Sequence, residues 1–251
     1  MTTLAVVAAR SRSGLVAALL AVAGFAWIVT GVRTRGMDDG PWTSLGAPTW
    51  FIGVWLAMTA AMMLPSVWPT VALQSRMGEG RSALAPLLFT TTYLATWVAF
   101  GALAFGIAAL GERVAGDFLA WSRGGRWLAG ATLLAAAVYE LTPTKRHCLD
   151  NCRNPFRSLM QSWRAGPEGA LELGARHGAW CVGCCWALMA SLFALGMMSL
   201  VWTALIAAVI AVEKLLARRS VATVGTVLLL ASLGVAVLAS PDAVPMLTVP
   251  V

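Results

Sequence analysis

The sequence predicts an all-α fold, a polytopic bundle of about seven transmembrane helices with one short amphipathic helix in the membrane interface. Of its 251 residues, 59% are hydrophobic and only 12% are charged, whereas a soluble domain carries about twice that charged fraction. Several uncharged runs reach the roughly 20 residues that a helix needs to cross a hydrocarbon core of about 30 Å. None shows the alternation of a membrane β-barrel, so we expect the spans to be helices.

The apolar runs are distributed along the whole chain, so we expect residues 1–251 to form a single integral membrane domain. The first run is long for a secretory signal and no small-residue cleavage site follows it, so we expect a retained helix. As a single helix, residues 179–216 would be about 57 Å long, nearly twice the bilayer core, so we expect a tight turn near 196–199. The expected spans are 14–32, 50–73, 85–110, 126–143, 178–197, 199–216 and 220–239.

Basic residues predict the orientation of these spans, because short cytoplasmic loops are enriched in Lys and Arg. With seven spans and a cytoplasmic N-terminus, few basic residues fall outside: Arg33, Arg35, Arg113, Arg123 and Arg126. We therefore expect the N-terminus in the cytoplasm and the C-terminus outside. The net charge of +7 is accounted for by these loops, so the lipid bilayer is an expected partner and nucleic acid is not.

The long connection over residues 144–177 is cytoplasmic in this topology. Within it, Phe156, Leu159, Met160 and Trp163 follow the i, i+3, i+4, i+7 pattern of an apolar helix face. That pattern predicts the short interfacial helix. The connection also opens a segment, from His147 to Cys185, that contains all five cysteines and both histidines of the chain.

This Cys/His segment is the strongest chemical signal in the sequence. Its candidate metal ligands form two groups, His147, Cys148 and Cys152 in one and His177, Cys181, Cys184 and Cys185 in the other. On a helix, the first three residues of the second group share a face. Thiolates with a few imidazoles suit Cu(I), Zn(II) or an iron-sulfur cluster.

Two other interpretations of the cysteines stay open. Free cysteine is a common small apolar residue in protein interiors, so the thiols could simply pack. Cys181 and Cys184 also have the C-x-x-C spacing of a redox pair, although a reducing cytoplasm disfavours a permanent disulfide.

Methionines form a second candidate feature in the expected span 50–73. Met58 and Met62 share a helix face, and Met63 is adjacent. Thioethers bind Cu(I) without losing a proton, so this pair could hold the ion within the membrane, with Met189 extending the path if the second and fifth spans touch. The alternative is that methionine fills irregular gaps beside a helix kinked by proline.

Two acids, Glu140 and Glu213, fall within expected spans. Ionisable groups inside a membrane are costly and tend to be functional or paired. We expect them to orient a ligand histidine or balance a bound cation, or else to pair with Lys145 or Lys214.

Three motifs carry a family resemblance: "AMMLPS" (61–66), "YELTPTKRHCLDNCR" (139–153) and "HGAWCVGCCWALMASLFALGMMSLVW" (177–202). In these the chain resembles a family of bacterial predicted metal-binding integral membrane proteins of unknown function, sometimes labelled copper chaperones. The resemblance implies metal handling in a bacterial plasma (inner) membrane, without identifying the metal, the substrate or the direction of transfer.

The sequence favours a protein that binds a soft metal ion, Cu(I) first and Zn(II) second, and hands it by ligand exchange to a partner protein or across the membrane. A metal donor or acceptor protein would be the partner. The alternatives are a membrane thiol oxidoreductase, with Cys148 or Cys152 resolving a Cys181–Cys184 disulfide, or a non-catalytic scaffold. No nucleophile and base couple or phosphate-binding loop is present, so we assign no catalytic residue and do not expect an ATP-driven pump.

Overall fold

The structure is a bundle of helices, as expected. This computed structural model describes residues 2–35, 46–77, 84–119, 121–154, 156, 164, 166–197, 199–216 and 219–239. Its elements are α1 (Thr2–Arg33), α2 (Pro48–Met77), α3 (Leu84–Leu119), the π-helical turn η1 (Trp121–Gly125), α4 (Arg126–Glu140), α5 (Pro143–Arg153), α7 (Pro167–Leu195), α8 (Leu200–Leu215) and α9 (Arg219–Ala239). No strand occurs in these described ranges.

Five of the helices are long and apolar enough to cross a membrane, namely α1, α2, α3, α7 and α9. The expected fourth and sixth spans correspond to α4 and α8, which have only 15 and 16 residues, or about 22 to 24 Å of helix. The expectation of seven spans therefore stays a prediction.

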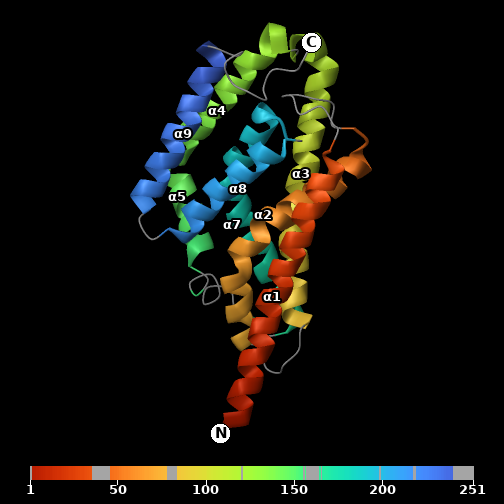
Figure 1. The fold of residues 1–251 in the computed structure, drawn as a ribbon, viewed down its shortest axis with the longest axis vertical. Helices are drawn as coiled ribbons and strands as arrows, with labels where there is room; N and C mark the ends of the chain where they lie inside the picture. Colours follow the sequence, from red (N-terminus) through yellow and green to blue (C-terminus); the bar gives the residue numbers. More distant parts are fainter. Residues whose placement is uncertain are drawn as a thin grey trace.

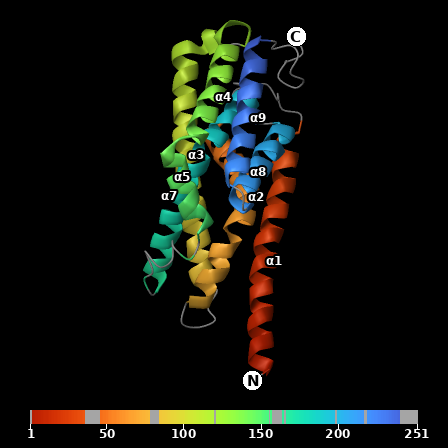
Figure 2. The same ribbon diagram turned by 90° about the vertical axis from the view of Figure 1, so that its left-hand side faces the viewer.

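The chain runs back and forth along the long axis of the molecule. Helices α1, α2 and α3 alternate in direction. Helix α5 then continues in the same direction as α4, and α7, α8 and α9 alternate again (Figures 1 and 2). The N-terminal end of α1 and the C-terminal end of α9 therefore lie at opposite ends of the bundle.

Helices α2 and α7 form the interior of the bundle. In each, 61% of the most apolar window is buried, compared with 11% in α3. Helix α7 contacts α3, α4, α5 and α8, so residues on several of its faces are covered by protein. An apolar helix that is buried on all sides needs small residues where its neighbours approach closely.

Glycines provide that close approach between α7 and α3. A Cβ atom at Gly174 would lie 2.4 Å from the carbonyl oxygen of Phe89, and one at Gly178 would lie 2.8 Å from the side chain of Thr96. The two glycines are four residues apart and so face the same neighbour. Their contact places the aromatic residues of α3 directly against α7.

The structure corrects the expected loop over 144–177, which contains two helices. Helix α5 begins at Pro143, and the Thr142 side chain accepts a hydrogen bond from the Lys145 amide at 3.2 Å, a standard N-cap. Helix α7 begins at Pro167 instead of residue 178, because proline fits the first helical position and Glu168 suits the positive end of the helix dipole. The predicted interfacial helix lies outside the described residues, apart from Phe156 and Arg164.

The chain turns between α7 and α8 where the sequence predicts a turn. Gly196 ends α7 with a φ of 102°, a conformation that glycine adopts without strain. The Ser199 amide donates to the Gly196 carbonyl oxygen at 3.1 Å, and α8 begins at Leu200. Residues 179–216 are therefore not one continuous helix.

The Gly174 contact makes a testable prediction about stability. Gly174→Ala should lower the free energy of unfolding by about 1 to 3 kcal/mol, because the new methyl group meets the Phe89 backbone. Gly106→Ala is the matched control, since a Cβ there meets nothing within 4 Å and alanine favours the helix by up to about 1 kcal/mol. Thermal unfolding in detergent checks both variants, and equal melting temperatures would contradict the packing described.

Candidate metal centre

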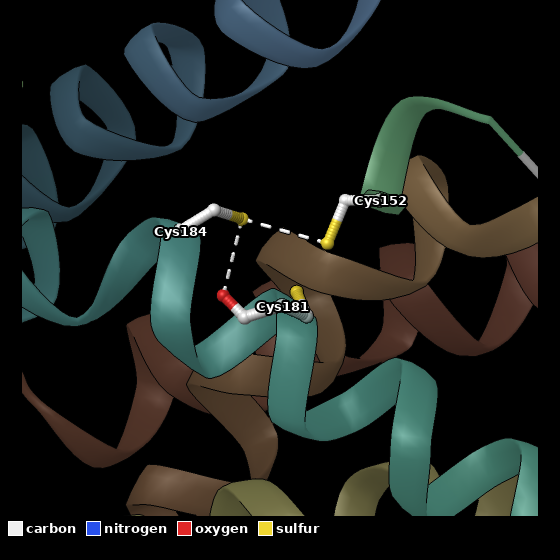
Figure 3. Close-up of side chains that lie close together, drawn as sticks. All are labelled: Cys152, Cys181 and Cys184. Atoms are coloured by element: carbon white, nitrogen blue, oxygen red, sulfur yellow. Dashed lines mark hydrogen bonds between the residues drawn. The ribbon is translucent and has the colours of Figure 1, made fainter. Parts of the chain in front are cut away.

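Three thiols converge where the end of α5 meets the middle of α7. The sulfur atoms of Cys152, Cys181 and Cys184 all lie within 4.8 Å of one another, and we call these residues the thiol trio. The Sγ atoms of Cys152 and Cys184 face each other at 3.6 Å (Figure 3). Cys181 and Cys184 are buried and Cys152 is half-buried, and every described cysteine is free of disulfide bonds.

The spacing of the trio suits a metal ion bound by sulfur. Metal to thiolate bonds of about 2.3 Å in a trigonal arrangement place the sulfur atoms about 4 Å apart. The trio needs only small side-chain movements to reach that geometry. An all-sulfur donor set favours soft ions such as Cu(I) over hard ones such as Mg²⁺.

Methionine supplies a further sulfur beside the trio. The Met63 Sδ atom lies 4.0 Å from the Cys181 Sγ atom, and this contact shows that α2 and α7 touch. Met58 instead has its Sδ atom 4.0 Å from the Thr203 hydroxyl on α8. Met62 and Met189 are buried in the core, so a path through these methionines stays a prediction.

The other two cysteines border the trio. Cys185 Sγ lies 3.3 Å from Cys184 Sγ. Cys148 faces α7 at Gly183, where its sulfur lies 2.7 Å from the position that a Cβ atom would take. Burial raises the pKa of the Cys148 thiol, while the charge of Lys145 partly opposes that rise.

Neither histidine belongs to the group of ligand atoms found among the described residues. The Nε2 atom of His147 lies 3.4 Å from the Asn151 amide nitrogen, and its ring meets the edge of Trp180. The His177 ring is buried against Phe89 and Tyr93. Because α7 begins at Pro167, His177 lies inside that helix and not just before it, as the expected span 178–197 implied. A ligand role for either histidine stays a prediction.

His177 nevertheless has an unusual buried atom. Its Nδ1 atom has no hydrogen-bond partner within the part of the chain that the structure describes. Most buried polar atoms are paired.

Lys214 is the main residue of the site that the sequence did not predict. Its Nζ atom lies 3.1 Å from the Cys181 Sγ atom and donates to the Ser66 hydroxyl at 3.1 Å. The Tyr93 hydroxyl lies 3.0 Å from the same sulfur. A charge beside a thiol lowers the cost of the thiolate that a metal ion requires. The sequence signal was a lysine in an apolar run, which we considered only as a partner for the two acids, Glu140 and Glu213.

Both predicted acids pair with Lys145. The Lys145 Nζ atom donates to Glu140 at 2.6 Å and to Glu213 at 2.8 Å, and all three side chains are at most 2% exposed. Burial lowers the pKa of Lys145, but the attraction of Glu213 and Glu140 outweighs it and raises that pKa above its usual value. The two ion pairs join α4, α5 and α8. Pairing of the acids with Lys145 is one of the alternatives that the sequence left open.

The fold and the thiol trio define a class of protein, a multi-helix protein with membrane-length apolar helices and a buried cysteine group that could hold a metal ion. Residues 52–237 match the model of a family described as PpoB2, copper chaperone. The match covers most of the chain, and the chain belongs to this family, which confirms the resemblance seen in the motifs. No curated protein and no solved structure matches it.

The buried Lys145 pair predicts a large effect on stability. Lys145→Met should lower the free energy of unfolding by about 3 to 5 kcal/mol, because it leaves two carboxylates buried without their cation. Arg164→Met is the control, since its bond to Glu172 at 3.2 Å is largely exposed and such pairs contribute at most about 1 kcal/mol. Denaturant unfolding in detergent measures both, and similar small effects would show that the carboxylates are not both charged.

Proposed function

We propose that the protein binds Cu(I) at the thiol trio in a bacterial plasma membrane and passes it to a partner protein or across the membrane. The convergence of three thiols from two helices within 4.8 Å carries the proposal. The copper chaperone description of the family supports the choice of ion. The copper ion is cargo in this proposal, and the chain performs no covalent chemistry on it.

The donor set favours Cu(I) over Zn(II), which is the second ion we consider. Structural zinc sites are almost always four-coordinate, and the trio supplies three ligands. The neighbouring Met63 offers a thioether, a ligand that suits Cu(I). Apolar surroundings also favour an ion of low charge, because burial of charge is costly.

Transfer of the ion would proceed by exchange of sulfur ligands. Cys185 and Met63 lie next to members of the trio, so each can replace one ligand after a short movement. Cys148, His147 and His177 are proposed as auxiliary ligands near the trio, and Met58, Met62 and Met189 as stations further along the bundle. We propose a cytoplasmic N-terminus and an outer C-terminus, with Glu140 and Glu213 as supporting charges.

A thiol oxidoreductase is the second candidate, and two observations favour it. The Cys152 and Cys184 sulfurs lie 3.6 Å apart, and a disulfide would require them to approach to about 2.05 Å. The Lys214 ammonium beside Cys181 would also suit a nucleophilic thiolate. This facing pair of thiols from two helices differs from the Cys181–Cys184 pair expected from the C-x-x-C spacing.

Metal analysis of the purified, reduced protein tests the proposal. The wild-type protein should bind about one Cu(I) ion per chain, and Cys181→Ser or Cys184→Ser should weaken binding at least tenfold, because each removes one of three thiolates. Cys148→Ser is the comparison variant: this cysteine lies on α5 outside the trio and is proposed to contact the ion only during transfer, so its loss should weaken equilibrium binding less than threefold. Elemental analysis gives the stoichiometry, and competition with a Cu(I) chelator gives the affinity.

The opposite results are equally informative. A wild-type protein without copper, together with a reversible Cys152–Cys184 disulfide seen by mass spectrometry, would support the oxidoreductase. Equal loss of copper in Cys148→Ser and Cys181→Ser would show that the thiol trio alone does not form the metal site.

A further inference from the structure

Lys214 places a positive charge in direct contact with the thiol trio. Its Nζ atom lies 3.1 Å from Cys181 Sγ, 3.8 Å from Met63 Sδ and 3.1 Å from Ser66 Oγ. Three contacts, two on α2 and one on α7, hold the ammonium group in place. Lys145 lies in a different setting, because its charge is offset by two carboxylates at 2.6 and 2.8 Å.

An ion in the trio would lie close to this charge. An ion bound to Cys181 at about 2.3 Å must lie within about 5.4 Å of the Lys214 nitrogen, because the nitrogen is 3.1 Å from the sulfur. At such a distance in a protein interior, two unit charges repel strongly, and the repulsion is proportional to the charge of the ion. A divalent ion is therefore disfavoured twice as strongly as a monovalent ion.

We infer that Lys214 determines the charge specificity of the site, admitting monovalent Cu(I) and disfavouring divalent ions such as Zn(II). This inference rests on the proposed function and assigns a role to a residue that the trio itself does not contain. The three thiolates are soft ligands that both Cu(I) and Zn(II) accept, so sulfur alone gives limited discrimination between them. The fixed ammonium adds a difference that depends on charge.

The proposed role can be separated from a general effect of Lys214 on the thiols. The ammonium also stabilises the Cys181 thiolate, which assists binding of every metal ion by the same factor. That factor cancels in the ratio of the Cu(I) and Zn(II) affinities of one protein. The repulsion does not cancel, because it acts twice as strongly on Zn(II).

The test compares Cu(I) and Zn(II) affinities in the full-length protein in detergent. Lys214→Gln removes the charge while keeping a polar side chain, and Lys214→Met is a second neutral variant in case the first fails to fold. We expect the ratio of Cu(I) to Zn(II) affinity to fall at least tenfold in either variant, since one unit of charge at about 5 Å is worth roughly a hundredfold at an effective dielectric constant of about 20. Lys214→Arg keeps the charge and should retain the wild-type ratio within about threefold. Chelator competition for each metal gives the affinities, and thermal unfolding confirms that the variants are folded.

Each outcome has a defined meaning. If the neutral variants lose affinity for both ions in parallel, Lys214 has only a structural or thiolate-stabilising role and the inference is wrong. Absence of Zn(II) binding in every variant also overturns it, because removal of the charge should admit zinc. A wild-type protein that binds no Cu(I) instead contradicts the proposed function, whereas a wild-type protein that binds Cu(I) with an unchanged ratio in Lys214→Gln contradicts the inference alone.

Discussion

The close approach of α7 to its neighbours determines where the functional groups lie. Where α3 and α5 cross α7, there is no room for a Cβ atom on α7, and glycine occupies these positions. Gly174 lies against the Phe89 backbone of α3, and Gly183 lies against the Cys148 side chain of α5. Without that approach, Tyr93 would not reach the Cys181 sulfur and the end of α5 would not bring Cys152 to Cys184. Small residues are the usual means of bringing helices together in a membrane, because lipid gives apolar side chains no preference for protein.

The composition and the apolar runs were sufficient to predict the helical fold, and helical spacing predicted that Cys181 and Cys184 lie on one side of α7. Neither feature could predict which thiol of α5 joins them. Cys148 and Cys152 are four residues apart and share a helix face, so their roles differ only because α5 meets α7 at a particular height. That height depends on the contact of Cys148 with Gly183 of α7, which is a tertiary feature.

The polar groups also divide into those that the sequence could predict and those that depend on tertiary contacts. Glu140 and Glu213 were recognisable because an acid in an apolar run requires a partner, and Lys145 was among those considered. The helix that the Lys214 side chain faces was not predictable from the sequence. Adjacent residues of a helix point about 100° apart, so a small error in the rotation assigned to the helix changes the partner of a side chain. His177 shares a face with Cys181, yet the longer α7 places it among the aromatic rings of α3, where its imidazole is surrounded by Phe89 and Tyr93.

Glu213 and Lys214 are consecutive residues, and they bind different helices. Glu213 contacts Lys145 of α5 and Lys214 contacts Cys181 of α7. The end of α8 is therefore bonded to both helices that supply the thiols. Since the two side chains are fixed relative to each other by one peptide unit, rotation of α8 about its axis would disturb both contacts together. The distance between Cys152 and Cys181 is thereby tied to the rotational setting of a helix that contributes no sulfur of its own.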